Sequence, residues 1–204
     1  NVDIWRIRAF SLVDAKDRDF KSALEAFAAI QRRNAIKPED HILMGRAYFG
    51  VGMDTEAFDS FQKAIATDSA NCDIYFPLGS LLMKKQDYAA ASQMFEKKIS
   101  CDPKSLSTYI NAAITYMQKS NLNLPRAREL LVKSIELKSD FLQGRLWLAR
   151  YYAQVDTFDL AEGQYLEVLK IVGDPPTDKK NNPPYGESQK LLGSLYMTKR
   201  QYTK

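Results

Sequence analysis

The sequence is poor in the residues from which catalytic and metal sites are usually built. Its 204 residues include one histidine, His41, and two cysteines, Cys72 and Cys101. A Cys/His zinc site needs four ligands in short paired spacings, so the sequence does not indicate one. It also has neither a glycine-rich phosphate loop nor a serine in a nucleophile elbow. We therefore expect a chain that is not an enzyme and that binds no metal and no cofactor.

Long apolar runs and a strong excess of one charge are also missing. No apolar stretch reaches the roughly eighteen residues needed to cross a membrane. Lys and Arg total 29 against 25 for Asp and Glu, and a net charge of +4 does not by itself indicate nucleic acid binding. Residues 170–204 hold seven basic and three acidic residues, so a salt-sensitive contact of this segment with an acidic partner stays open as an alternative.

The two ends of the sequence have the appearance of an excised piece. The chain starts at Asn1, a helical pattern begins at about Ile4, and a similar pattern is still running at Lys204. We therefore expect a fragment of a longer protein. Because any leader would lie outside such a fragment, the sequence leaves the compartment open between the cytoplasm and the bacterial cell envelope, including the periplasm.

The strongest positive signal is an internal repeat. Gly45, Gly79 and Ala113 are spaced by 34 residues, and further copies centre on Ala149 and Gly193 after 36 and 44 residues. Each of these small residues is followed three positions later by an apolar or aromatic residue. Within a unit the apolar residues recur at helical spacing, and breakers separate the segments. Each unit is therefore predicted to be a hairpin of two helices.

On these features the chain resembles the tetratricopeptide repeat family over nearly its whole length. The third unit fits the family's signature best, whereas Ile7 and His41 stand where the family favours tryptophan, Asp54 replaces an aromatic residue and Asp14 replaces a tyrosine. The matching residues of the third unit are Tyr75, Leu78, Gly79, Leu82, Tyr88, Ala91, Phe95 and Pro103.

This resemblance implies an all-α fold, a right-handed superhelical solenoid of helix-turn-helix repeats. We expect a single array over residues 1–204, with the larger insertion forming an exposed proline-rich loop at 175–185. The predicted repeats cover about 4–37, 38–71, 72–105, 106–141 and 142–175, followed by a partial sixth repeat at 186–204.

The small residues have a packing explanation. Two helices approach closely only where a side chain is nearly absent, so these positions should let the second helix of each unit lie against the first. Aromatic residues such as Phe61, Phe95 and Tyr165 should then fill the space between neighbouring units. These residues are predicted to be core. The positions of close approach are Gly45, Gly79, Ala113, Ala149 and Gly193.

A second apolar stripe suggests an interaction surface. In the fourth unit, Ile110, Ile114 and Met117 lie roughly 130° away from the core stripe around the helix axis. A helix that is apolar on two faces is either buried on both or forms an interface, so packing against a neighbouring unit stays open beside a peptide-binding groove. By the resemblance, this stripe lines the concave side. The predicted partner-binding residues are Ile42, Arg46, Phe49, Phe76, Ser80, Met83, Ile110, Ile114, Met117, Leu146 and Arg150.

The sequence thus predicts a protein-protein interaction module, a non-catalytic adaptor or assembly scaffold that binds a peptide or helix of an unnamed partner. A self-assembling scaffold that forms homo-oligomers is the alternative. An RNA-binding helical repeat is less favoured, because such arrays need a basic groove.

The two cysteines flank the third unit. The ends of a hairpin return to the same side, so a disulfide between Cys72 and Cys101 is conceivable, although Cα atoms more than about 7 Å apart cannot be bridged. We expect two free, partly buried thiols.

Overall fold

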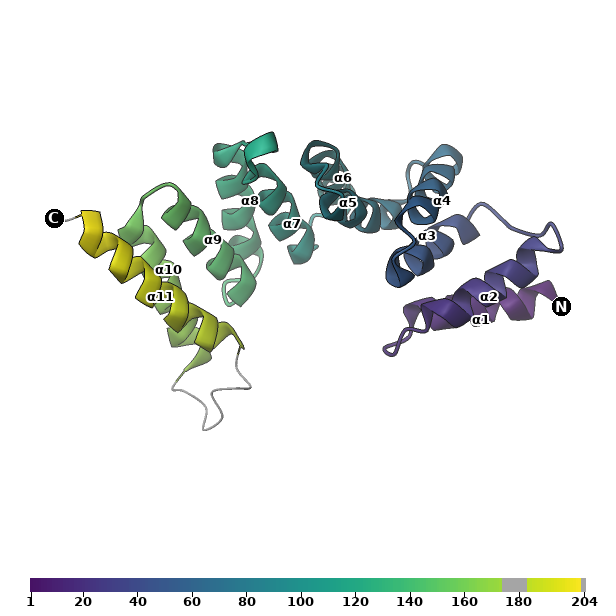
Figure 1. Ribbon diagram of the computed structural model, residues 1–204, viewed down its shortest axis with the longest axis horizontal. Helices are drawn as coiled ribbons and strands as arrows, with labels where there is room; N and C mark the ends of the chain where they lie inside the picture. Colours follow the sequence, from purple (N-terminus) through teal and green to yellow (C-terminus); the bar gives the residue numbers. More distant parts are fainter. Residues whose placement is uncertain (174–182, 203–204) are drawn as a thin grey trace. The chain divides into compact units, whose positions relative to one another are not determined.

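The computed structural model describes residues 1–173 and 183–202, which form helices joined by short turns (Figure 1). The described residues contain no strand. Two short 3-10 helices, η1 (Cys72–Ile74) and η2 (Lys119–Asn121), accompany the α-helices. The α-helices are α1 (Val2–Asp14), α2 (Phe20–Gln31), α3 (Asp40–Val51), α4 (Asp54–Thr67), α5 (Tyr75–Lys84), α6 (Tyr88–Cys101), α7 (Leu106–Tyr116), α8 (Leu124–Leu137), α9 (Leu142–Gln154), α10 (Phe158–Val172) and α11 (Pro183–Tyr202).

Consecutive helices pack as hairpins. The pairs α1 and α2, α3 and α4, α5 and α6, α7 and α8, and α9 and α10 make extensive contacts, and one pair falls in each predicted repeat. Residue contacts divide the chain into two compact units, residues 1–102 with α1 to α6 and residues 103–204 with α7 to α11.

The predicted exposed loop lies largely outside the described residues. Of the range 175–185, residues 175–182 fall there, whereas 183–185 already belong to α11. This helix begins at Pro183, three residues before the predicted start of the sixth repeat, and it packs against α10 and α9.

In the hairpins α3–α4 and α5–α6, the two helices approach each other closely at a glycine. A Cβ atom added at Gly45 would lie 2.6 Å from Cε1 of Phe61, and one at Gly79 would lie 2.7 Å from Cε1 of Phe95. Both phenylalanine rings are completely buried. Any side chain at these two positions would therefore collide with the core, which confirms their predicted packing role.

Gly193 does not share this role, and the prediction made for it is wrong. It is exposed, and a Cβ atom there would meet nothing within 4 Å. The physical reason is that the described residues contain no second helix packed on this face of α11.

The repeat spacing also fails in α1. Ile7 was aligned with His41, but its side chain is 70% exposed. The buried residues of this helix are Ala9 and Val13, and Trp5 packs against the apolar cluster that contains Phe27. On α1, the aromatic residue that packs against the core is thus Trp5, two residues before the position Ile7 that the repeat spacing predicts.

A repeated hydrogen bond ties the junctions between repeats. The hydroxyl of Tyr75 donates to the carbonyl of Ser69, six residues earlier in the preceding loop. One repeat later, Tyr109 Oη donates to the carbonyl of Pro103 at 3.1 Å. Both the donor positions and the acceptor positions of these two bonds are 34 residues apart. The same hydrogen bond therefore recurs in two successive repeats.

Arginine replaces tyrosine at two other junctions. Arg145 Nε donates to the carbonyl of Ser139 at 3.0 Å, again across six residues. At the first junction the donor comes from α1, where Arg6 Nη2 lies 2.7 Å from the carbonyl oxygen of Ala35. Arg6 also donates from Nε to Asp40 Oδ1 at 2.9 Å, and Asp40 is buried, with 1% exposure. This pair joins the first two hairpins across one repeat length.

The packing of Phe95 generates a stability prediction. Phe95→Ala removes a completely buried ring next to Gly79, so the free energy of unfolding should fall by about 3–5 kcal/mol. The matched control is Phe10→Ala, at an exposed site on α1, which should change it by less than about 1 kcal/mol. Urea unfolding followed by circular dichroism measures both. Equal losses for the two variants would contradict the packing described here.

Candidate interaction surfaces

The predicted interaction face is half-buried in residues 1–102. Ile42 and Phe49 project from α3, and Phe76 and Met83 from α5. The Phe76 ring lies 5.9 Å from the ring of the core residue Phe95, measured between centroids. Part of each side chain therefore supports the hairpins while the remainder is accessible to a partner.

The predicted polar contacts of this face are already engaged within the unit. Arg46 Nη2 forms an ion pair with Asp14 Oδ1 of α1 at 2.6 Å, and the Ser80 hydroxyl donates to the Phe76 carbonyl at 2.9 Å. A partner that used Arg46 would have to share or displace the Asp14 carboxylate.

In residues 103–204 the same face is less accessible than the sequence predicted. Ile114 and Met117 are half-buried, but Ile110 is 6% exposed and Leu146 is 1% exposed. The assignment of Ile110 and Leu146 to a binding surface is therefore wrong, and both are core residues. The neighbouring first helices α7 and α9 contact each other, so apolar residues on their facing flanks are covered.

Arg150 of the same unit is held by two neighbours. Its guanidinium lies 4.5 Å from the centroid of the Trp147 ring, which is a cation-π distance, and it forms an ion pair with Glu187 of α11. Arg150 was predicted to supply a polar contact to a partner, but its charge is already balanced by Glu187.

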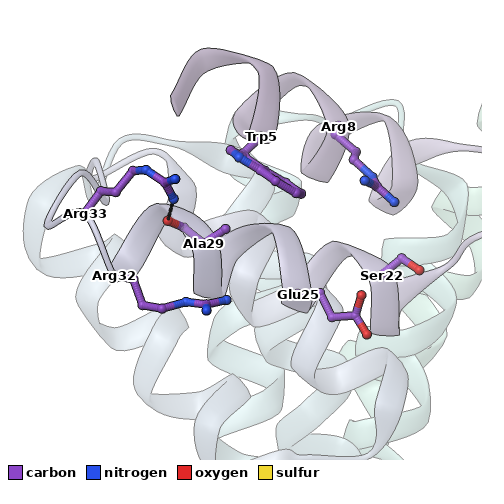
Figure 2. Close-up of a pocket in the computed structure, with 7 residues that line it drawn as sticks. All are labelled: Trp5, Arg8, Ser22, Glu25, Ala29, Arg32 and Arg33. Atoms are coloured by element: carbon purple, nitrogen blue, oxygen red, sulfur yellow. Dashed lines mark hydrogen bonds between the residues drawn. The ribbon is translucent and has the colours of Figure 1, made fainter. Parts of the chain in front are cut away.

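A pocket lies elsewhere, between α1 and α2 (Figure 2). It has a volume of about 770 Å³. Trp5 and Arg8 of α1 line one side, and residues of α2 and the turn that follows it line the other. The lining residues are Trp5, Arg8, Ser22, Glu25, Ala29, Arg32 and Arg33.

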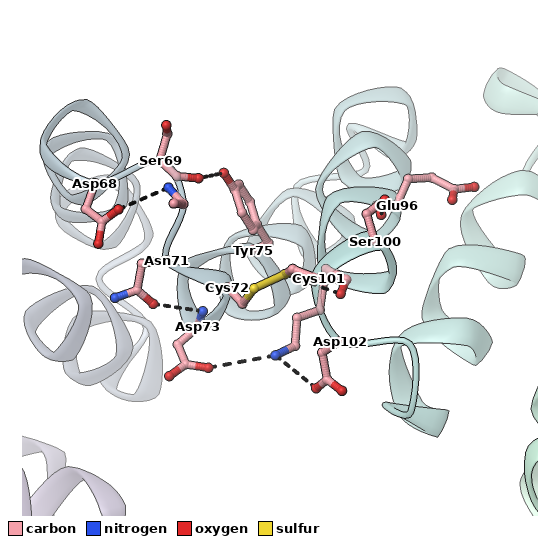
Figure 3. Close-up of a disulfide and its surroundings, with 12 residues drawn as sticks. Asp68, Ser69, Asn71, Cys72, Asp73, Tyr75, Glu96, Ser100, Cys101 and Asp102 are labelled. Carbon is pink, nitrogen blue, oxygen red and sulfur yellow. Dashed lines mark hydrogen bonds and ion pairs between the residues drawn. A yellow bond between two sulfur atoms is a disulfide. The ribbon is translucent and has the colours of Figure 1, made fainter.

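The cysteines are joined by a disulfide (Figure 3). The Cys72 and Cys101 sulfurs lie 2.07 Å apart and their Cα atoms 6.1 Å apart. The expectation of two free thiols is therefore wrong. The turn of η1 brings Cys72 to the end of α6, which places the two residues within bridging distance. Beside the bond, Lys98 Nζ lies 3.7 Å from Asp73 and 3.2 Å from Asp102.

In the described parts of the chain, no three His, Cys, Asp or Glu side chains are grouped so that they could hold a metal ion. None of the helices in residues 1–173 and 183–202 combines the length and the apolar character of a membrane span.

Solved structures match this arrangement. Over 83% of this chain and 94% of the other, a MamA structure from Desulfovibrio magneticus superposes with a TM-score of 0.74 at 18% sequence identity. The C-terminal part of a TPR repeat-containing protein from Cytophaga hutchinsonii matches all of this chain and 79% of its own length, with a TM-score of 0.74 at 22% identity. The chain has a tetratricopeptide-like helical repeat fold. No family model matches the sequence, and no curated protein does.

Within this repeat fold, the pocket residues were not predicted from the sequence. Arg32 and Arg33 follow one another at the end of α2, and Trp5 and Arg8 are three residues apart on α1. Helical spacing places Trp5 and Arg8 near one face of α1, whereas Arg32 and Arg33 directly follow α2. Only the packing of the hairpin brings the two pairs together. The signal available was the basic doublet at a helix end.

His41 shares its repeat position with Tyr75 and Tyr109 but makes no equivalent bond. Its Nδ1 atom is buried and has no hydrogen-bond partner among the described residues. Burial lowers the pKa of His41, Lys63 lowers this pKa further, and Asp40 opposes the change. The fold therefore favours the neutral imidazole.

This preference predicts a pH dependence of stability. Because the pKa of His41 is lower in the folded chain than its unfolded value of about 6.5, its contribution to stability is complete above that pH and is lost as the pH falls below it. The urea midpoint of the wild type should therefore drop between about pH 7.5 and pH 5.5 by more than that of His41→Phe. The variant keeps an apolar ring and cannot be protonated. Identical pH profiles of the urea midpoint for the two proteins would show that His41 does not contribute to the pH dependence of stability.

The disulfide gives a second prediction. It closes a loop between residues 29 apart, so the double variant Cys72→Ser with Cys101→Ser should lose about 3–4 kcal/mol of unfolding free energy. Reductant should lower the melting temperature of the wild type and leave that of the double variant unchanged. A wild-type melting temperature that is insensitive to reductant would contradict a stabilising bond.

Proposed function

We propose that this chain is a protein-protein interaction module, a non-catalytic adaptor or assembly scaffold whose first helices hold a peptide or helix of a partner. One observation carries this proposal. The interaction face, now defined separately in each unit as Ile42, Phe49, Phe76 and Met83 in residues 1–102 and as Ile114 and Met117 in residues 103–204, consists of half-buried apolar side chains. Ile42 and Phe76 share one repeat position, and Phe49, Met83 and Met117 share another. Apolar surface that is left accessible at the same place in successive repeats is typical of a binding surface.

The chemistry of this face suits an extended peptide or an amphipathic helix. Met83 and Met117 are flexible and adapt to side chains of different shape. Lys84 Nζ lies 5.7 Å from the Phe49 ring centroid and 2.7 Å from Asp54 Oδ1, so a polar rim borders the apolar surface. Burying each apolar anchor contributes roughly 1.5–3 kcal/mol before ordering costs, which supports affinities near the micromolar range.

A self-assembling scaffold is the second candidate, favoured by apolar side chains at the first and last described helices. Ile4, Ile7 and Phe10 are exposed on α1, and Tyr196 and Met197 on α11. Exposed apolar side chains grouped on one helix favour association with another surface.

The interaction face is tested with two charge insertions and a matched control. Met83→Glu and Ile114→Glu place a carboxylate on half-buried positions of α5 and α7, whereas Met53→Glu changes an exposed methionine that precedes α4. A peptide selected from a displayed library on the wild type should bind at least one of the two face variants about tenfold more weakly or worse, and the control with unchanged affinity. Isothermal titration measures binding, and circular dichroism verifies folding.

Full affinity in both folded face variants would overturn this proposal. Sedimentation velocity over a concentration series distinguishes the second candidate. A monomer at all concentrations supports an adaptor. Oligomers that form with increasing concentration and persist in Met83→Glu support assembly through α1 or α11.

A further inference from the structure

The pocket between α1 and α2 uses a different face of α2 from the hairpin core. On α2, the buried side chains that form apolar clusters with Met44 and Ala47 of α3 are Ala23, Ala26, Phe27 and Ile30. The α2 residues that line the pocket are a different set, which includes the buried Ala29. On the α1 side, Trp5 both lines the pocket and packs against the cluster that contains Phe27 and Met44, so the core holds the indole in place.

Three arginines border this pocket. Hydrogen bonds from Ser22 lower the pKa of Asp19 and the charge of Arg8 lowers it further, so Asp19 offsets part of the Arg8 charge. Arg32 Nε donates to the Ala28 carbonyl at 3.3 Å. Arg33 Nη1 donates to the Ala29 carbonyl at 2.9 Å (Figure 2). These bonds orient the two guanidinium groups and leave most of their five N–H donors for other acceptors. Among the described residues, no carboxylate forms an ion pair with Arg8, Arg32 or Arg33.

Trp5 gives the pocket an apolar wall. The indole is half-buried between α1 and α2, and the Arg8 guanidinium lies 5.6 Å from its ring centroid. An indole face combined with guanidinium groups accommodates a ligand that carries both carboxylates and an apolar portion. The one acidic side chain of the lining, Glu25, leaves a local excess of two positive charges.

From this arrangement we propose that the α1–α2 pocket binds an acidic peptide segment of a partner protein. Glutamate or aspartate side chains of the segment pair with Arg8, Arg32 and Arg33, and its aliphatic portions pack on Trp5. Glu25 repels the ligand, so it limits affinity and disfavours acidic groups on its own side of the pocket. This proposal rests on the proposed function, because it also takes a protein as the partner. The binding surface and the chemistry of the ligand are different.

Single-stranded nucleic acid also combines stacking with negative charge, but the pocket fits it less well. Such ligands need a basic groove that follows several phosphates together with a series of aromatic platforms. Here one indole is present, and the Glu25 carboxylate lies among the lining residues. A peptide with spaced carboxylates avoids this repulsion more easily than a continuous phosphate backbone.

The test uses Trp5 as the reporter. The chain has two tryptophans, so Trp147→Phe leaves Trp5 as the only one. Titration of this protein with an acetylated and amidated hexaglutamate peptide should give a saturable change in fluorescence that weakens with added salt. Blocking both peptide ends restricts the charge to side-chain carboxylates.

Three further changes are made in the Trp147→Phe protein. Replacing both Arg32 and Arg33 by Ala should weaken hexaglutamate binding about tenfold, whereas Glu25→Gln should strengthen it about two- to threefold, because repulsion is removed. Arg18→Ala, which removes an exposed arginine between α1 and α2 that does not line the pocket, is the matched control and should change affinity less than twofold. Circular dichroism verifies that each variant is folded.

Several results would overturn the proposal. These are a linear, unsaturable titration, equal weakening by Arg18→Ala and by the double arginine variant, or weaker binding in Glu25→Gln. Tighter binding of a six-nucleotide oligothymidylate than of hexaglutamate would assign the pocket to nucleic acid instead. Binding of the library peptide to the interaction face is measured separately. The result for one surface therefore does not determine the result for the other.

Discussion

The absence of a side chain at one position of a first helix governs how a hairpin closes. At Gly45 and Gly79 the second helix approaches so closely that its phenylalanine ring occupies the space of a Cβ atom. Phe61 and Phe95 are consequently completely buried. This close approach brings the two helices of these two hairpins together. The faces of the first helices that are not used in this packing are the candidate surfaces for partners.

The distribution of arginines shows how the surfaces differ. Arg6, Arg46 and Arg150 each pair with a carboxylate on another first helix, so they connect neighbouring repeats and neutralise charge there. Arg32 and Arg33, at the end of α2, form no such pair among the described residues and border the pocket instead. Internal pairing thus leaves the first-helix faces mainly apolar, while the pocket keeps its positive charge.

The fold could be predicted from the sequence because its determinants are local and recur. The 34-residue spacing of Gly45 and Gly79, each followed by an aromatic residue at a fixed distance, specifies both helices of a hairpin and their contact. The accessible face could be predicted only in part. Periodicity shows that Ile110 lies on a second apolar stripe, but it does not show that this residue is buried in the folded chain. For the cysteines, spacing left both states open until the turn of η1 fixed the distance between Cys72 and Cys101.

The hydrogen bonds at the junctions have a consequence for how the repeats come apart. Tyr75, Tyr109 and Arg145 each reach back from the helix that follows the loop, so those loops are attached to the hairpin they enter. The first loop is held from both sides, because Arg6 of α1 donates to the Ala35 carbonyl and the Asp40 carboxylate of α3 accepts from the backbone N–H of Lys37. Arg6 and Asp40 also pair with each other. Local opening of the first hairpin therefore separates the buried Asp40 carboxylate from its arginine partner, which adds an electrostatic cost to that opening.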